Sequence, residues 1–219
     1  PWVAGMTVLV VSILLTGAFH EDGLADTADA LGGAAHDREK IFVILKDSRV
    51  GAFGALALVI SIAFRLVLLA GLGAAAPAAL VLAHCLARVG PVWLMAALPY
   101  VSGADAKNRQ VARAGTAQAV MATVVGVAVC VGLIAGGGLA TGGWQVGAPH
   151  VGDALAGGSV IGLAGVLAAA GAMAAGTALC GWRFRARAGG VTGDFLGATE
   201  QVNEILILLA VLAVLGVVP

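Results

Sequence analysis

The sequence predicts an all-α integral membrane protein, with residues 1–219 forming a single bundle of about six transmembrane helices. Hydrophobic residues make up 60% of the chain and charged residues only 11%, and the mean hydropathy is +1.02. A soluble domain typically carries about 25% charged residues. The 33 glycines show no triplet period, and they suit close approach of helices in lipid. These observations exclude a soluble globular domain and a collagen-like chain.

Six apolar segments are long enough to cross a hydrocarbon core, which takes about 20 helical residues. They lie at about 2–19, 51–76, 78–98, 115–140, 155–182 and 199–218. Pro77 and Pro99 bound the third segment. The chain starts at Pro1 and is apolar at once, so we expect a further N-terminal segment upstream of it.

Basic residues divide sharply between the two ends of the predicted bundle. Ten of the twelve lie in the connections 20–50, 99–114 and 183–198: Arg38, Lys40, Lys46, Arg49, Lys107, Arg109, Arg113, Arg183, Arg185 and Arg187. The opposite connections, near residue 77 and over 141–154, carry none. Because positively charged loops stay in the cytoplasm, the sequence predicts a multi-pass membrane protein whose basic end is cytoplasmic.

An acidic cluster lies at the same end. Seven of the twelve acidic residues fall between positions 20 and 51: Glu21, Asp22, Asp26, Asp29, Asp37, Glu39 and Asp47. Asp22, Asp26 and Asp29 have the spacing i, i+4, i+7, which places them on one face of a helix. Crowded carboxylates repel one another unless a cation lies among them, and Mg²⁺ prefers oxygen ligands. The spacing therefore predicts a Mg²⁺ site rather than a solvated acidic turn.

Lys46 and Arg49 flank Asp47 and Ser48 directly before the second span. Two cations beside a metal site could hold phosphate oxygens. They could equally be a positive flank, with Ser48 capping the helix that follows. The spacing alone does not separate these two interpretations.

A glycine-rich segment at 189–197 surrounds Asp194, and Glu200 and Glu204 follow at the predicted entrance of the last span. Backbone amides freed by such a loop can hold phosphate. We therefore expect Asp194 and Glu200 to contribute to a substrate site rather than only to a capped, flexible loop.

Arg65 and Arg88 are the charges that the sequence places deep within spans. A charged side chain at membrane depth is costly and usually faces a partner or a polar cavity. We expect Arg65 to pair with the acidic cluster or with Glu204, and Arg88 to act at the substrate site. His84 lies one turn before Arg88, and a buried, hydrogen-bonded histidine is the simpler interpretation there.

These groups together predict phosphoryl transfer at the membrane–cytoplasm interface. The metal would neutralise phosphate charge, and Asp26 or Asp47 would hold or deprotonate an attacking hydroxyl. The expected partners are the lipid bilayer and phosphorylated small molecules, with no nucleic acid. Small-residue pairs such as Gly132 and Gly136 suit helix packing within one protomer or in a homo-oligomer. The non-enzyme alternative is a divalent-cation transporter, which would need carboxylates deep within its spans.

Three segments carry a family resemblance: HEDGLADTADALGG with DREKIFVILKDSRVGAFGALAL, then ARVGPVWLMAALPY, then GGVTGDFLGATEQVNE. They resemble the cobalamin synthases, also called adenosylcobinamide-GDP ribazoletransferases. The resemblance implies a Mg²⁺-dependent inner-membrane enzyme of cobamide synthesis. Such an enzyme joins adenosylcobinamide-GDP to α-ribazole or its 5′-phosphate, and it releases GMP when the ribose hydroxyl attacks the phosphate on the cobinamide arm.

The resemblance also assigns residues. Asp22, Asp26 and Asp29 match the family's acidic, metal-binding motif, and Asp26 and Asp47 are the expected catalytic residues. The expected substrate-binding residues are Lys46, Ser48, Arg49, Arg88, Asp194 and Glu200. The alternative enzyme is a CDP-alcohol phosphotransferase, but the Asp-Gly-x-x-Ala-Arg core of that family is absent because aspartate and threonine occupy positions 26 and 27.

Overall fold

The computed structural model describes residues 1–35, 37–101, 114–135 and 161–216, and over these ranges it is helical, with one isolated bridge between Tyr100 and Val191 and no strand. The expected all-α fold is confirmed. The helices are α1 (Trp2–Thr16), α2 (Phe19–Gly33), α3 (Arg38–Ile44), α4 (Ala52–Leu72), the 3₁₀ turn η1 (Gly73–Ala75), α5 (Ala76–Ala87), α6 (Val89–Ala97), α7 (Thr116–Ala135), α9 (Leu163–Ala188) and α10 (Gly193–Leu215). The predicted basic residues Lys107, Arg109 and Arg113, the loop 141–154 and Gly136 lie outside the described residues.

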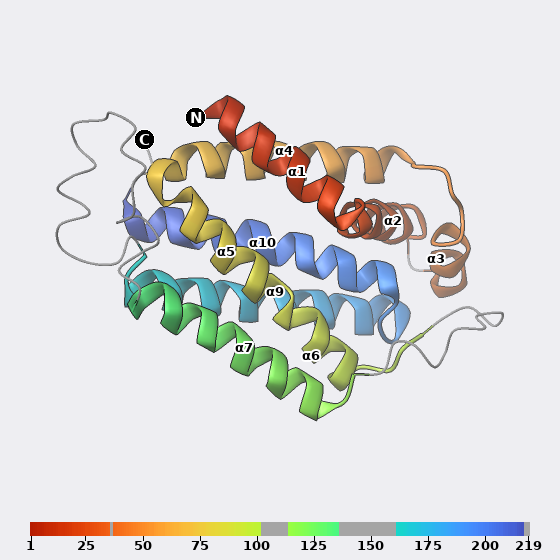
Figure 1. Ribbon diagram of the computed structural model, residues 1–219. Coiled ribbons are helices and arrows are strands. Elements are labelled where there is room, and N and C mark those ends of the chain that lie inside the picture. The colour runs from red at the N-terminus through yellow and green to blue at the C-terminus, as the bar shows by residue number, and fades with distance from the viewer. Residues whose placement is uncertain (36, 102–113, 136–160, 217–219) are drawn as a thin grey trace.

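The chain is a membrane protein by the length and hydropathy of its helices. Four described stretches could cross a bilayer: Ala52–Ala97, Thr116–Ile134, Leu163–Ala188 and Gly193–Leu215, with α1 and α2 as a fifth if that bent pair is one span. The first stretch turns back at η1, so that α4 and the α5–α6 arm run in opposite senses along the bundle (Figure 1). This arrangement is compatible with the six predicted spans.

Two boundaries differ from the sequence prediction. The connection 20–50 is mostly helical, and α2 leaves α1 at 88°. The bend follows from two consecutive left-handed residues, Gly17 (φ 64°) and Ala18 (φ 58°), since this conformation cannot continue a right-handed helix. Helix α10 begins at Gly193 rather than at 199, with the Thr192 hydroxyl capping the Phe195 amide at 3.2 Å. Glu200 and Glu204 therefore lie inside the helix.

The described parts of the three segments predicted to be cytoplasmic, which include α2, α3, the residues after α6 and the turn from α9 to α10, lie at one end of the bundle (Figure 1). Backbone bonds join Val191 to Pro99 (2.9 Å) and to Val101 (2.8 Å), which ties the end of α9 to the segment after α6. The Arg187 guanidinium donates to the Leu31 carbonyl at the end of α2, at 3.2 Å. Stacked rings of Phe184 and Phe195, 4.3 Å apart, fill the core beneath these contacts.

Candidate functional site

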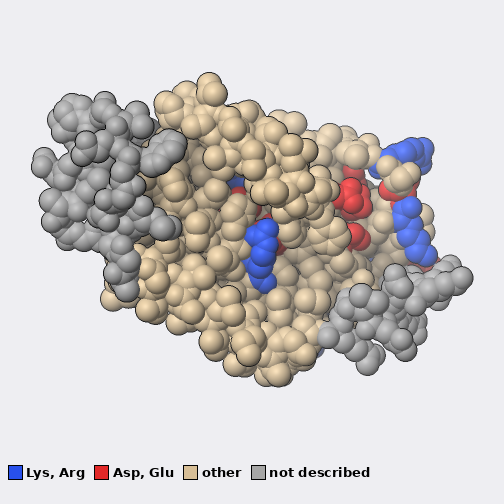
Figure 2. Space-filling view, viewed as in Figure 1, with Lys and Arg blue, Asp and Glu red and all other residues tan. Residues whose placement is uncertain are grey.

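The acidic face of α2 forms the first part of the site. Burial alternates along this helix: Gly23, Ala25 and Asp29 are buried, Asp22 is exposed and Asp26 is half-buried. Figure 2 shows acidic side chains gathered over α2, with basic side chains beside them where α3 lies. Asp22 and Asp26 are one turn apart, so neighbouring carboxylates open towards solvent there.

Helix α10 brings a further aspartate to this face. The backbone of Asp194 lies against Gly23, where an added Cβ would be only 2.8 Å from the Asp194 carbonyl oxygen. The charges of Asp22, Asp29 and Asp194 all act on the Asp26 carboxyl. The sequence assigned Asp194 to a phosphate loop, whereas the fold places it with the aspartates of α2. The sequence predicts that both segments lie at the same end of the bundle, but not that Asp194 approaches Asp22 and Asp26.

Asp29 is turned away from solvent and towards the start of α4. Its Oδ2 accepts from the Gly51 amide at 2.7 Å, and its Oδ1 accepts from the Gly54 amide at 2.9 Å. Helix α4 is thus capped by a carboxylate from α2 and not by Ser48, which the helix-cap interpretation had favoured. The assignment of Asp29 as a metal ligand stays a prediction, and both of its oxygens already have amide donors.

Asp47 and Arg49 form an exposed pair between α3 and α4. The Arg49 guanidinium donates to both carboxylate oxygens, at 2.7 Å from Nη2 to Oδ2 and 3.0 Å from Nε to Oδ1. These bonds lower the pKa of Asp47 to about 2. A carboxylate with so low a pKa is a weak proton acceptor, so the pairing disfavours Asp47 as a general base. Lys46 and Ser48 are exposed beside this pair.

A second polar cluster lies inside the bundle. Arg65 is 1% exposed and pairs with Glu21 at 3.0 Å and with Glu204 at 3.7 Å, which confirms the expected ion pairs. Gln201 Nε2 donates to Glu21 at 3.3 Å and to Glu200 at 3.1 Å. The Arg65 guanidinium thus compensates two buried carboxylates, of which Glu21 is also hydrogen-bonded to it and Glu204 is paired at the longer distance. The sequence predicts no role for Gln201, and it places Glu21 only within the acidic cluster.

Arg88 links this inner cluster to the surface. Its Nη1 lies 3.0 Å from Glu200 Oε1 and 3.3 Å from His84 Nδ1. Its side chain is 41% exposed, and Figure 2 shows a basic side chain interrupting the apolar surface where α5 meets α6. His20, beside the acidic cluster on α2, approaches Glu200 Oε2 at 3.8 Å. The structure therefore brings the predicted residues Arg88 and Glu200 together, and it connects them to α2 through His20.

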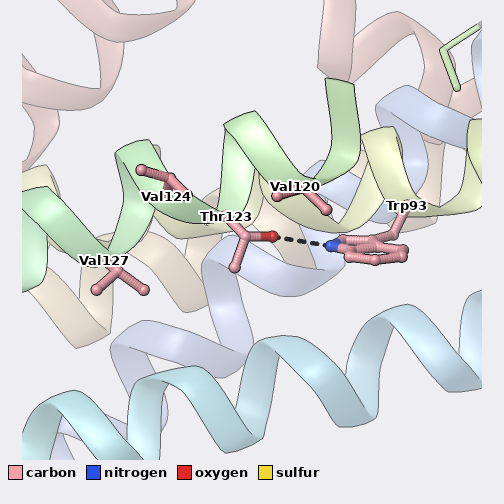
Figure 3. A pocket seen from close by; sticks show the side chains of 5 residues that line it. All are labelled: Trp93, Val120, Thr123, Val124 and Val127. Carbon is pink, nitrogen blue, oxygen red and sulfur yellow. Dashed lines mark hydrogen bonds between the residues drawn. The ribbon is translucent and has the colours of Figure 1, made fainter. Parts of the chain in front are cut away.

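An apolar groove of about 250 Å³ lies elsewhere, between α6 and α7 (Figure 3). Its lining residues are Trp93, Val120, Thr123, Val124 and Val127. The single polar contact drawn there joins the Trp93 indole N–H to the Thr123 hydroxyl at 2.9 Å. With no charged group in its lining, the groove is not the site of phosphoryl chemistry.

The α2 end offers carboxylates, the ligand type that a hard divalent cation prefers. Asp22, Asp26 and Asp194 offer carboxylate oxygens, and the close approach at Gly23 holds the two helices at a distance that a side chain would prevent. The exposed cations Lys46 and Arg49 lie nearby on the chain, before α4. Carboxylates and cations side by side at the end of the bundle can bind a metal together with phosphate oxygens.

Comparison with known proteins agrees with this arrangement. The family model described as cobalamin-5-phosphate synthase matches residues 1–212. An adenosylcobinamide-GDP ribazoletransferase of Albidiferax ferrireducens is 37% identical over 210 residues, covering 94% of this chain and 71% of the relative. Those of Leptothrix cholodnii and Rhizobium etli are each 38% identical, covering 94% and 96% of this chain and 71% and 73% of the relatives. No solved structure gives a significant match. The chain belongs to the cobalamin-5-phosphate synthase family.

Proposed function

We propose that the chain is an adenosylcobinamide-GDP ribazoletransferase whose active site is the acidic end of the bundle. It would join adenosylcobinamide-GDP to α-ribazole or its 5′-phosphate. The observation that carries the proposal is the meeting of Asp22 and Asp26 on α2 with Asp194 on α10, since these residues come from two of the three segments that resemble the family. The family match favours this function over a CDP-alcohol phosphotransferase or a cation transporter.

The transfer breaks a phosphoanhydride bond and forms a phosphate ester. The ribazole hydroxyl oxygen forms a bond to the phosphorus on the cobinamide arm, the bond from that phosphorus to the bridging oxygen breaks, and GMP leaves with the electron pair. We propose Asp26 as the acceptor of the hydroxyl proton, because it is half-buried next to other carboxylates, whereas Asp47 is held ionised by Arg49. Lys46, Ser48 and Arg49 would bind phosphate oxygens.

The proposed cofactor is Mg²⁺, held by Asp22 and Asp26 with Asp194. When bound, the ion would neutralise charge on the phosphates and on the departing GMP. The protein's own groups would orient the two substrates: Arg88 and Glu200 deeper in the bundle, and the Asp47–Arg49 pair at its edge. Orientation alone can supply a large part of the rate enhancement, since it removes the entropy cost of bringing two molecules together.

We also propose that this end faces the cytoplasm and that the membrane is the cell inner membrane. The described cations at this end are Arg38, Lys40, Lys46, Arg49, Arg183, Arg185 and Arg187, whereas the described residues at the opposite end include no Lys or Arg. Positively charged segments of this kind are retained in the cytoplasm.

The test is GMP release from adenosylcobinamide-GDP and α-ribazole 5′-phosphate by the protein in lipid nanodiscs, with and without Mg²⁺. We expect release that needs the metal and that falls by roughly a hundredfold or more in Asp22→Asn. Glu39→Gln is the matched control, because it removes an exposed carboxylate of α3 that is not among the proposed metal ligands. Release of CMP from a CDP-alcohol substrate instead, or full activity in Asp22→Asn, would contradict the proposal.

A further inference from the structure

A second group of ligand atoms lies deeper than the aspartates of α2. One ligand atom each of His84, Glu200 and Glu204 lies within 4.8 Å of the others, from α5 and from successive turns of α10. His84 Nδ1 is 3.9 Å from Glu204 Oε2. Glu204 is eleven residues into α10, about 17 Å of helix from Gly193, which is near the middle of a bilayer-spanning helix. The sequence had placed it at the membrane surface.

The carboxylates of this group are not fully satisfied by the protein. Glu204 is 1% exposed, and within the described residues its Oε1 has no hydrogen-bond partner. The Oε2 of Glu21, on the other side of Arg65, also lacks a partner there. A buried carboxylate oxygen without a donor is costly, and a cation bound beside it would relieve that cost.

The net charge of the buried groups favours the binding of a cation. Three carboxylates, Glu21, Glu200 and Glu204, face two guanidinium groups, Arg65 and Arg88, together with the imidazoles of His20 and His84. With neutral imidazoles the sum is one negative charge in a region that is otherwise apolar. If Arg88 turned outwards to solvent, as its 41% exposure allows, a dication would make the remaining set neutral.

The histidine has the geometry that a metal ligand needs. Arg88 Nη1 lies 3.3 Å from His84 Nδ1, which as an acceptor of that N–H keeps its lone pair on the side of the two glutamates. The opposite nitrogen, Nε2, is 3.5 Å from the Ser12 hydroxyl on α1, a contact that would orient the ring. Arg88 therefore lies between two of the three ligand atoms, in the place that an ion would take.

We propose that His84, Glu200 and Glu204 form a second divalent-cation site, of the type that binds a first-row transition metal, and that Arg88 competes with the ion for it. One imidazole with two carboxylates suits Mn²⁺, Fe²⁺ or Zn²⁺, whereas the all-oxygen set on α2 suits Mg²⁺. Bound metal would join α5 to α10 and release the Arg88 guanidinium towards an anionic substrate. The site shares Glu200 and Arg88 with the proposed substrate site, but its ligand group is distinct from the α2 aspartates, so metal binding here can be measured without the reaction.

The experiment titrates Mn²⁺ into the full chain in nanodiscs with excess Mg²⁺ present, and it detects nitrogen coordination by pulsed electron paramagnetic resonance. We expect one nitrogen-coordinated Mn²⁺ per chain, retained in Asp22→Asn and lost in His84→Gln and Glu204→Gln. Because Arg88 competes, Arg88→Gln should bind Mn²⁺ about tenfold more tightly or better.

A wild-type protein without nitrogen-coordinated Mn²⁺ at saturation would overturn the proposal, as would a signal that survives His84→Gln. An unchanged affinity for Mn²⁺ in Arg88→Gln would contradict the proposal that Arg88 competes with the ion. If Glu204→Gln does not fold, His84→Gln decides the outcome, since that side chain is 25% exposed and tolerates change more readily. Failure of GMP release alone would count against the proposed reaction and not against this site.

Discussion

Asp29 Oδ2 accepts a hydrogen bond from the backbone amide of Gly51 at 2.7 Å, although the two residues are 22 positions apart. The other oxygen, Oδ1, accepts from the Gly54 amide. One carboxylate therefore accepts hydrogen bonds from two of the N–H groups that have no partner within the helix at the start of α4. A Cβ at either glycine would collide with this carboxylate. The contact fixes the angle at which α2 meets α4, and with it the direction in which Asp22 and Asp26 face.

Asp29→Ala should therefore mainly lower the stability of the fold, rather than the affinity for Mg²⁺. Losing a cap typically costs about 1–2 kcal/mol in the free energy of unfolding, and the two amides left without an acceptor place this residue at the upper end. Thermal unfolding in detergent micelles, with Mg²⁺ affinity measured in parallel, tests this. Asp22→Asn is the control, with the opposite expected pattern: unchanged stability and weakened Mg²⁺ binding. Full stability in Asp29→Ala together with lost Mg²⁺ binding would instead make Asp29 a metal ligand.

Arg65→Met should be strongly destabilising, because it leaves Glu21 and Glu204 buried without their guanidinium. Breaking a buried ion pair from one side typically costs about 3–5 kcal/mol. Adding Glu21→Gln to Arg65→Met removes one uncompensated charge, so the double variant should recover part of the loss. A double-mutant cycle on unfolding free energies measures this coupling. If the two substitutions had strictly additive effects on the free energy of unfolding, the 3.0 Å contact between Arg65 and Glu21 would contribute no coupling energy.

The Asp47–Arg49 pair gives a prediction for pH. Its bonds lower the pKa of Asp47 from the ordinary value of 3.8 to about 2. A lowered pKa contributes stability above the ordinary value, and that contribution is lost as the pH falls from 3.8 towards 2. In Arg49→Gln the carboxyl should titrate near 3.8, as followed by the carbon chemical shift of labelled aspartate. Lys40→Gln, which removes a cation of α3 outside the pair, should leave the titration unchanged.

Much of the fold could be predicted because apolar length is a strong local signal. Segments such as 115–140 and 155–182 are long and nearly free of charge, and they correspond to α7 and α9. The two errors were at polar boundaries. The segment of α2 was assigned to a connection between spans because six of its residues are polar or charged, although the spacing of its aspartates indicates a helix there. The bend that precedes it depends on left-handed Gly17 and Ala18. No propensity predicts an alanine in that conformation.

The sequence predicts which residues contribute to the candidate site, but not which of them lie together. Spacing alone placed Asp22, Asp26 and Asp29 on one face, whereas the fold sends Asp29 to cap α4 and brings Asp194 in from α10. The sequence predicts a partner for Arg65 in the acidic cluster or in Glu204, but it does not show that Glu21 and Glu204 share this arginine, because the three residues lie on three helices. Contacts of this kind depend on how helices pack, which a single sequence does not contain.

The approach of α2 to α10 at Gly23 should be essential for activity. A Cβ there would lie 2.8 Å from the Asp194 carbonyl oxygen and 3.3 Å from the Gly197 Cα, and both are backbone atoms that cannot turn aside. Gly23→Ala should separate the helices and move Asp194 away from Asp26, so that GMP release and Mg²⁺ affinity fall together.

Gly33→Ala on the same helix is the matched control. Its Cβ would meet only the flexible end of Ile44 at 3.3 Å, so activity should be kept. Both changes raise intrinsic helix propensity equally, by about 1 kcal/mol, which leaves the contact with α10 as the difference between them. Equal activity in the two variants would mean that the spacing of α2 and α10 does not set the geometry of the aspartates, and that Asp194 acts independently of Asp22 and Asp26.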